Sequence, residues 1–374
     1  MKFDNLKTKD GNINITVENG IITEIEKAEN ESSTLYVIPA MADMHVHLRE
    51  PGQTHKEDVH TGTAAALAGG FTDIACMPNT TPPIDNARTM HLIVKKAENT
   101  GVRVHPIVSV TKGMKGIEVC NYKRLKEAGA VAISEDGLTV GTKQIMAEAI
   151  SNAYGLGLPI IAHCEPEIDI VEREIRLARE MKAAVHIAHV SRKKSVDLIR
   201  IAKRKGIKVT CETCPHYMLL TEKDFVDANQ KMKPPLRTEV DRLAVIDALY
   251  DGTIDCIVTD HAPHTESEKS SVATAPNGSI GLETALSAVI TAIGFDFDII
   301  EKLMVVRPRE ILGLPVPEIK VGNRAEFVIF DPAEKWVVDP ENFKSKSKNS
   351  AFNGMELTGK IKYVISGDMK INLK

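Results

Sequence analysis

Residues 36–52 read YVIPAMADMHVHLREPG, an apolar run that ends in a His-x-His-x-Arg series. It is the first of eight such runs, and segments with apolar residues near helical spacing separate them. Alternating β and α segments predict a parallel sheet, and eight units fit a closed (β/α)8 TIM barrel better than an open doubly wound sheet. The other seven runs are residues 71–77, 102–110, 130–133, 159–163, 184–190, 207–213 and 255–259.

The two ends of the chain have a different β pattern. Alternating residues flank Asn19-Gly20, which is a strong signal for a tight hairpin, and strand-like segments recur from residue 325 to residue 371. Short β segments are marginal alone, so we expect the two ends to pair with each other. The α/β chain is therefore predicted to have a barrel over residues 38–317 and a small β-sandwich-like domain built from residues 1–37 and 318–374.

Composition limits the classes of function. The 374 residues include 47 Lys and Arg against 51 Asp and Glu, and only 4% are aromatic, which argues against nucleic-acid binding. No run has the roughly 18 apolar residues of a membrane helix, and the start lacks the apolar core of a signal peptide. We therefore expect a cytoplasmic protein whose six scattered cysteines are reduced and mostly buried.

The two histidines that close the first run are spaced to share a metal ion. Side chains alternate along a strand, so His45 and His47 lie on one face, and Arg49 continues the row into the next loop. In a barrel that face points inward, and barrel active sites lie at the carboxyl ends of the strands. One histidine alone would be interpreted as a core residue, whereas this pair favours a metal site.

Later runs add candidates at the same rim. Counting inward positions places His163 at the end of the fifth run and Asp260 at the end of the eighth. His186 and His189 are three positions apart, so the alternation allows only one of them to face inward. His189 is the one at the carboxyl end, and His186 is expected to point toward the helices.

The fourth run leads into Ser134-Glu-Asp-Gly, where alternation puts Asp136 inward and Glu135 outward. The predicted set then holds four imidazoles and two carboxylates. This mixture is typical of one or two Zn²⁺ ions rather than Ca²⁺ or Mg²⁺. The predicted metal ligands are His45, His47, Asp136, His163, His189 and Asp260.

Six short motifs follow one another along the chain: DMHVHLREPG at 43–52, MPNT at 77–80, HCE at 163–165, HVS at 189–191, PPLR at 234–237 and TDHAPH at 259–264. From about residue 38 to residue 330, this series resembles the dihydroorotases of the amidohydrolase superfamily. The type resembled is the long bacterial one, in which Asp136 replaces the carboxylated lysine that bridges the metals in many relatives.

The resemblance implies reversible, zinc-dependent cyclisation of N-carbamoyl-L-aspartate to L-dihydroorotate in pyrimidine (UMP) biosynthesis. Asp260 would be the catalytic acid and base, and the Arg49 guanidinium would bind the substrate carboxylate. Lys233 stands where related sequences often carry asparagine, although a cation suits an anionic substrate. The expected substrate-binding residues are Arg49, Asn79, Lys233, His264, Asn277 and Gly278.

Two alternatives stay open. Hydantoinases and allantoinases are similar in fold and in the His-x-His pair, but they need a lysine on the fourth strand, and none occurs between Gly129 and Thr142. The second alternative is a non-catalytic scaffold that binds aspartate transcarbamoylase. A homodimer and a complex with that enzyme are the assemblies that the resemblance leaves open, whereas nucleic acid and membrane are not expected.

The remaining features have ordinary interpretations. Cys211 and Cys214 form a single CxxC after an apolar strand, which favours core thiols over a redox or zinc site. The Lys/Ser alternation at residues 344–349 predicts a solvated loop, and polar residues 265–274 suggest a mobile lid over the substrate. Solvated or core roles are expected for His55, His60, His91, His105, His186 and His216.

Overall fold

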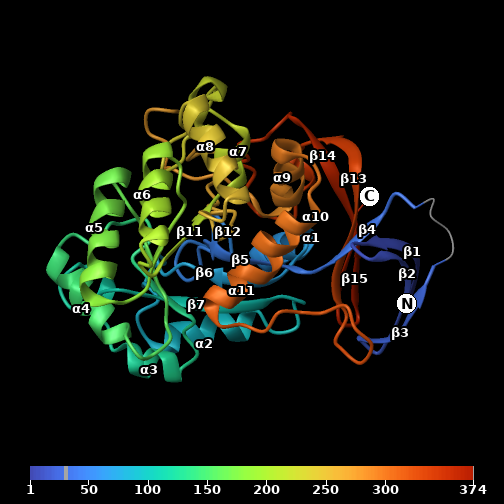
Figure 1. Ribbon diagram of the computed structural model, residues 1–374, viewed down its shortest axis with the longest axis horizontal. Coiled ribbons are helices and arrows are strands. Elements are labelled where there is room, and N and C mark those ends of the chain that lie inside the picture. The colour runs from blue at the N-terminus through green and yellow to red at the C-terminus, as the bar shows by residue number, and fades with distance from the viewer. Residues whose placement is uncertain (29–32, 374) are drawn as a thin grey trace.

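The computed structural model describes residues 1–28 and 33–373, and within them an eight-stranded sheet has its strands in chain order (Figure 1). Every neighbouring pair in the series is parallel. The strands are β5 (Met41–Val46), β6 (Phe71–Cys76), β7 (Arg103–Ser109), β8 (Ala132–Ser134), β9 (Ile160–Ala162), β10 (Val185–Ile187), β11 (Val209–Thr213) and β12 (Cys256–Ile257).

The first and last of these strands meet, which closes the sheet. Val46 pairs in parallel with His261, and the His47 amide donates to the His261 carbonyl at 2.9 Å. The buried carboxylate of Asp43 accepts the amides of Thr259 and His45 at 3.0 and 2.9 Å. Strand β5 is thereby fixed to the segment after β12, and the predicted (β/α)8 architecture is confirmed.

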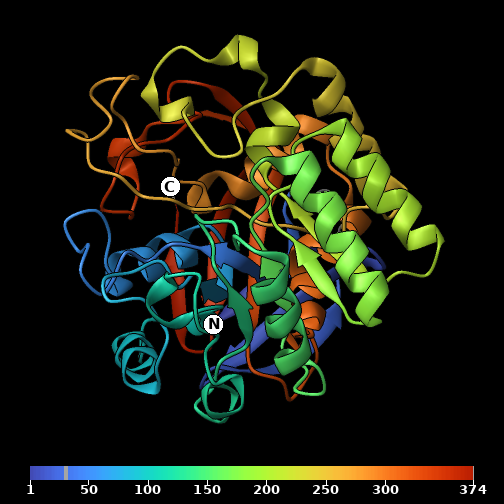
Figure 2. The same ribbon diagram turned by 90° about the vertical axis from the view of Figure 1, so that its left-hand side faces the viewer.

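Helices follow the strands and cover the outside of the barrel; α4 to α6 lie toward the viewer in Figure 2, on the side away from the chain termini. In α6, Val196, Ile199 and Ala202 recur every third residue and are buried, as expected for a helix with one apolar face. The helices are α1 (Val59–Ala68), α2 (Ala87–Lys96), α3 (Tyr122–Glu127), α4 (Lys143–Ala153), α5 (Glu167–Met181), α6 (Lys193–Arg204), α7 (Pro215–Leu219), α8 (Glu239–Tyr250), α9 (Ala285–Ile293), α10 (Phe297–Ile300) and α11 (Arg307–Leu312).

Short helical turns complete the barrel and its connections. They are the 3-10 turns η1 (Lys112–Met114), η2 (Glu222–Asp224), η3 (Ala228–Gln230), η4 (Leu282–Thr284) and η6 (Pro340–Asn342), and the π-helix η5 (Glu301–Val306). No helix in the described part of the chain is long and apolar enough to cross a membrane.

Both ends of the chain build a second sheet, whose order over the described residues is β15-β14-β13-β4-β1-β2-β3 (Figure 1). The predicted hairpin is present, with Asn19 and Gly20 in the left-handed region at φ 50° and 74°. Residues 29–32 and 374 of the predicted terminal domain lie outside the described residues. The strands are β1 (Lys2–Thr8), β2 (Gly11–Glu18), β3 (Ile21–Lys27), β4 (Tyr36–Pro39), β13 (Glu326–Val337), β14 (Glu356–Ser366) and β15 (Met369–Asn372).

The first apolar run serves both sheets, which corrects its interpretation as one barrel strand. The Ala40 amide donates to Glu326 of the terminal sheet, whereas the next amide, of Met41, donates to Gly70 in the barrel. The chain therefore passes from the terminal sheet to the barrel between Ala40 and Met41. The run from residue 36 to residue 44 is therefore divided between β4 and β5.

Strand β13 joins the two cores by simple alternation. Phe327 and Ile329 lie in the core of the terminal sheet, where the Phe3 and Phe327 rings meet edge to face at 5.5 Å. Val328 and Phe330 face the other way and lie in the main core around the barrel. Because successive side chains point to opposite faces, one strand packs both units.

Candidate metal centre and substrate pocket

A cavity of about 230 Å³ lies at the carboxyl ends of the barrel strands. In the described structure every predicted site residue lines it except His45, which is fully buried. The lining residues are His47, Arg49, Asn79, Asp136, Gly137, His163, His189, Lys233, Asp260, Ala262, His264, Asn277 and Gly278. The structure thus brings together residues from widely separated parts of the sequence.

Asp136 lies between two groups of histidines. Its Oδ1 is 3.4 Å from His45 Nε2, and its Oδ2 is 3.3 Å from His47 Nε2. On the other side, Oδ1 is 3.2 Å from His163 Nδ1 and 3.5 Å from His189 Nε2. The ligand atoms of each group lie within 4.8 Å of one another, so one carboxylate is shared by two candidate metal sites.

Asp260 approaches the first of these groups. Its Oδ1 is 3.1 Å from His47 Nε2 and 3.5 Å from His45 Nε2. Burial opposes ionisation, but the charges of His45 and the hydrogen bond from His47 hold the pKa of Asp260 below its usual value. The carboxylate form is therefore favoured at neutral pH, as a proton acceptor requires.

The donor set fits bound cations. His163 Nδ1 and His189 Nε2 face each other at 2.9 Å, where two lone pairs would repel unless a proton or a metal ion lies between them. His45 Nε2 is buried and has no hydrogen-bond partner in the described structure. Imidazole nitrogens and carboxylates in this proportion are the donors that zinc-type ions take.

Neighbouring polar groups fix which nitrogen of each His-x-His ring faces the cluster. His45 Nδ1 donates to Glu212 Oε1 at 2.5 Å, and His47 Nδ1 donates to Asn79 Oδ1 at 2.8 Å. Each contact leaves Nε2 free to act as a ligand. Asn79, predicted as a substrate anchor, thus has its side-chain oxygen directed to His47.

Sequence reasoning missed Glu212 and misplaced His186. The His186 ring donates to Glu212 Oε2 at 3.1 Å, so the prediction that it points toward the helices is wrong. His189 has φ 34°, and this left-handed residue interrupts the alternation, which allows both histidines to face inward. Glu212 lies inside the Cys-x-x-Cys motif on β11. Counting alternate positions along this strand places Glu212 on the inward face, and this could have identified it from the sequence.

Three predicted site residues have left-handed backbone, namely Arg49 at φ 59°, His189 at 34° and Asp260 at 47°. Such conformations cost about 1–3 kcal/mol for a residue with a side chain and tend to occur at functional sites. Each lies two or three residues after the end of a barrel strand, and all three side chains line the cavity at the barrel opening.

The side of the cavity that Arg49 lines is cationic. Arg49 Nε donates to the Pro263 carbonyl at 3.1 Å, and burial lowers the pKa of Arg49 to about 10, so the guanidinium stays charged. Burial and the cations Arg49 and Lys56 lower the pKa of His264 to about 3. The neutral His264 ring donates Nε2–H to the Asn277 carbonyl at 2.9 Å and faces Lys56 Nζ through Nδ1.

Lys233 and Gly278 complete the lining. Lys233 Nζ lies 3.5 Å from the Gly137 carbonyl at the cavity wall. The Gly278 amide donates to Lys231, and its carbonyl accepts from Asn349. At φ 136°, a Cβ on Gly278 would lie 2.7 Å from the Ala262 Cβ, so only glycine fits there.

The segment 344–350, which we call the strap, does not match its prediction as a solvated loop. Lys344 and Lys346 are exposed, but Ser345, Ser347 and Asn349 between and after them are buried. The sequence alternation is that of an extended segment with one face packed on the protein. Buried serines and asparagine are compatible with this because polar partners on the barrel satisfy them.

Residues 265–274, predicted as a lid, are mostly exposed. Lys269 is the exception, because its Nζ donates to the carbonyls of Ala228 and Pro276 at 2.8 and 2.9 Å. Burial lowers the pKa of Lys269 to about 8. The lid stays a hypothesis. The test is to replace residues 265–274 by a short glycine linker, and unchanged substrate affinity and turnover would refute it.

The residues given ordinary roles are placed as follows. All six cysteines belong to the described residues and are buried and unpaired. Burial raises the pKa of the Cys211 and Cys214 thiols, which keeps them protonated. His105 is paired with Asp73, and His216 is buried against Tyr217, whereas His55, His60 and His91 are exposed.

Comparison with known proteins identifies the family. Residues 35–221 match the family model described as Dihydro-orotase-like. The chain is 42% identical to the dihydroorotase of Acetivibrio thermocellus over 97% of this chain and 96% of that protein. It is 40% identical to the dihydroorotase of Aquifex aeolicus over 97% of this chain and 95% of the relative.

Solved structures agree on the fold. L-hydantoinase (dihydropyrimidinase) from Arthrobacter aurescens has a TM-score of 0.85 at 22% identity, covering 97% of this chain and 93% of its own. D-hydantoinase from Thermus sp. has a TM-score of 0.81 at 22% identity, covering 99% and 96%. At this identity the likeness concerns the fold alone, but the sequence relatives extend over nearly the whole chain. The chain therefore belongs to the dihydroorotase family of cyclic amide hydrolases.

Proposed function

We propose that the protein interconverts N-carbamoyl-L-aspartate and L-dihydroorotate in pyrimidine biosynthesis, with one or two Zn²⁺ ions as cofactor. The observation that supports this most is the position of Asp136 between two histidine groups, at the floor of a cavity that Arg49 and Lys233 also line. A metal site next to fixed cations suits an anionic cyclic amide.

The metal would be held by His45, His47, Asp136, His163 and His189, with Asp260 beside them. When bound, such a cation polarises a carbonyl oxygen and lowers the pKa of a water molecule. The protein's own contribution is to hold the rings. Glu212 and Asn79 keep the Nδ1 atoms of His45 and His47 occupied, so both Nε2 atoms stay directed at the site.

Asp260 is the proposed acid and base. In ring opening its carboxylate accepts a proton from the attacking water and delivers it to the departing amide nitrogen. In ring closure the same oxygen accepts the proton from the ureido nitrogen as that nitrogen attacks the carboxyl carbon, and delivers it to the departing oxygen, which leaves as water. His47 Nε2 lies 3.1 Å from this carboxylate, so the proposed base stands beside a proposed metal ligand.

Arg49 is the proposed anchor for the substrate carboxylate. Its Nε is fixed by the Pro263 carbonyl, so the guanidinium is oriented before substrate arrives. A planar guanidinium binds a carboxylate through two parallel hydrogen bonds. Lys233 adds a second cation, and His264 and Asn277 lie beside Arg49 as polar neighbours.

The test is a comparison of substrates on the purified, zinc-loaded chain. We expect turnover of L-dihydroorotate and N-carbamoyl-L-aspartate, and little turnover of hydantoin or allantoin. Faster turnover of hydantoin or allantoin would assign the chain to another cyclic amidohydrolase. No bound metal and no turnover, with or without aspartate transcarbamoylase, would favour the scaffold role.

Assembly and location are further parts of the proposal. A homodimer and a complex with aspartate transcarbamoylase are the assemblies to test, by light scattering of the chain alone and after mixing. We propose a cytoplasmic location, which cell fractionation tests directly.

A further inference from the structure

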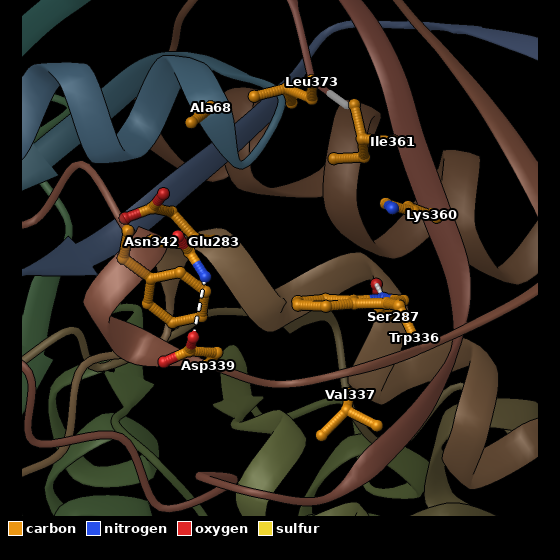
Figure 3. A pocket seen from close by; sticks show the side chains of 11 residues that line it. Ala68, Glu283, Ser287, Trp336, Val337, Asp339, Asn342, Lys360, Ile361 and Leu373 are labelled. Atoms are coloured by element: carbon orange, nitrogen blue, oxygen red, sulfur yellow. Dashed lines mark hydrogen bonds between the residues drawn. The ribbon is translucent and has the colours of Figure 1, made fainter.

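The strap carries part of the terminal segment to the rim of the barrel. It begins after η6, where the Glu283 carboxylate accepts the backbone amides of Lys344 and Ser345 at 2.9 and 3.0 Å. Figure 3 shows Glu283 on the wall of a cavity of about 410 Å³, which Asn342 of η6 and the preceding Asp339 also line. The first anchor of the strap is therefore outside the barrel opening.

Its second anchor is the segment that precedes α1. Ser345 Oγ donates to Glu57 Oε2, and the Lys346 amide donates to Glu57 Oε1 at 3.1 Å. Ser347 Oγ donates to the Lys56 carbonyl at 2.7 Å. Glu57 is fully buried, so these bonds hold the strap in one path toward the substrate cavity.

At the end of this path, Asn349 uses its whole side-chain amide. Its Oδ1 accepts the His264 amide at 3.0 Å, and its Nδ2 donates to the carbonyls of Ala262 and Gly278 at 3.2 and 3.1 Å. The side chain is 3% exposed. One residue therefore ties the loop after β12 to the loop that carries Asn277 and Gly278.

The two loops leave little room for movement. A Cβ on Gly278 would lie 3.1 Å from His264 Nε2, so the glycine backbone packs directly on that ring. The same Nε2 is 2.9 Å from the Asn277 carbonyl and 3.3 Å from Arg49 Nη2. Any shift of either loop is transmitted to the side chain that faces Arg49.

We propose that Asn349 is a positioning residue that sets substrate affinity by holding His264 and Gly278 in place beside Arg49. This inference rests on the proposed function for the identity of the substrate. In the described structure, the hydrogen bonds of Asn349 go to residues 262, 264, 278, 279 and 280, none of which is a candidate metal ligand. The Asn349 side chain therefore acts on binding and leaves the metal centre intact.

The experiment replaces Asn349 in the full-length, zinc-loaded enzyme. Asn349→Leu keeps the size of the side chain and removes all three hydrogen bonds, whereas Asn349→Asp keeps the acceptor for His264 and loses both donors. With L-dihydroorotate we expect KM to rise about tenfold or more for each variant, because small misplacements of binding groups are costly. We expect kcat to stay within about threefold and the metal content to stay unchanged.

Ser350→Ala is the matched control. Ser350 is adjacent and fully buried, and its Oγ contacts only the Phe352 amide among the hydrogen bonds of the described residues. Its KM should stay within about twofold of the parent, since nothing on the substrate side is lost. An equal rise of KM in this control, or a fall in kcat alone in the Asn349 variants, would overturn the positioning role.

Hydrogen exchange separates this inference from the proposed function. In Asn349→Leu the His264 amide loses its acceptor, so peptides covering residues 262–264 and 277–280 should exchange faster, while peptides from β5 should not. If the parent enzyme fails to turn over dihydroorotate, the proposed function is wrong, yet this measurement still decides whether Asn349 holds the two loops. Unchanged exchange in both peptides would refute it.

Discussion

At Asp260 the backbone φ of 47° lies in a region that aspartate and asparagine adopt more readily than other side chains. Asp260→Asn should therefore fold like the parent. Because an amide accepts no proton, we expect turnover of L-dihydroorotate to fall by about 10²–10⁴-fold. Steady-state kinetics together with thermal unfolding test this, and a variant as active as the parent would exclude Asp260 as the base.

Glu212 offers a second test at the level of one residue. Glu212→Gln weakens the acceptor that holds His45 and His186, and we expect metal affinity to fall about 10–100-fold. Zinc retained after dialysis against a graded chelator measures this without an assay of activity. Glu326→Gln is the control, since Glu326 is also a buried carboxylate but pairs with Arg103 and Arg324 at the terminal sheet.

Residue-level prediction from the sequence depends on regular backbone. Alternation along β5 correctly places His45 and His47 on one side of the cluster, because that strand is extended up to Val46. Alternation misplaces His186 because it assumes extended backbone as far as His189, whereas His189 is left-handed and interrupts the two-residue repeat. The role of Asn349 could not be predicted from the sequence, since the partners of its side chain lie 71 or more positions earlier in the chain.

Among the elements, the start of the strap has a pH-dependent anchor. Burial raises the pKa of Glu283 to about 7, although the amides of Lys344 and Ser345 oppose this. The folded state binds this proton more tightly than the unfolded chain does. The resulting stabilisation is present below about pH 4 and is lost as the pH rises through 7.

Glu283→Gln removes this titration and keeps an oxygen acceptor for the amides. We expect the free energy of unfolding of the variant, relative to the parent, to increase by up to about 2 kcal/mol between pH 5 and pH 8. Among the charged neighbours of Glu283, Lys348 lowers its pKa and Glu57 raises it. Urea denaturation at both pH values measures the difference, and a constant difference would contradict the prediction.

The series of apolar runs and helical segments predicts the barrel but not the connections between the barrel and the second sheet. The first apolar run looks like one strand because both of its halves are apolar, and only the hydrogen bonds of Ala40 and Met41 reveal the change of sheet. The strap looks solvated because its residues are polar. In both cases the missing information is the partner, which local sequence does not contain.

For the whole molecule, the predicted boundaries of residues 38–317, and of 1–37 with 318–374, are a proposal about folding units. An ion network crosses between them. Arg103 of β7 binds Asp73 of β6 through two bonds of 2.7 and 2.8 Å, and it also pairs with Glu326 of β13. Arg309 of α11 binds the same Asp73 at 2.8 Å.

Asp73 should therefore matter to the stability of the whole chain. Burial opposes ionisation, but hydrogen bonds from His105 and Arg103 and the charge of Arg309 hold the pKa of Asp73 well below its usual value. Asp73→Asn leaves a fully buried Arg309 without its carboxylate, and we expect a loss of about 3 kcal/mol or more at pH 7.

The pH dependence gives the sign of this effect. A depressed carboxyl pKa stabilises the fold above about pH 4 and loses that contribution as the pH falls below it. The difference in unfolding free energy between the parent and Asp73→Asn should be constant from pH 7 to pH 5 and smaller at pH 3. Urea denaturation at the three pH values measures it, and an unchanged difference at pH 3 would show that the ion network is not the cause.

The path of the strap also bears on the order in which the protein becomes competent during its synthesis. Every residue of the predicted metal-ligand set precedes residue 261, so a growing chain carries this complete set before the strap is made. Asn349 is made later than all of these ligands, and until it is in place the loops that carry His264 and Gly278 lack the hydrogen bonds of its side chain, although the His264 ring already contacts the Asn277 carbonyl directly. The candidate metal ligands are thus made early in synthesis, and the side-chain bonds of Asn349 to the proposed substrate loops form later.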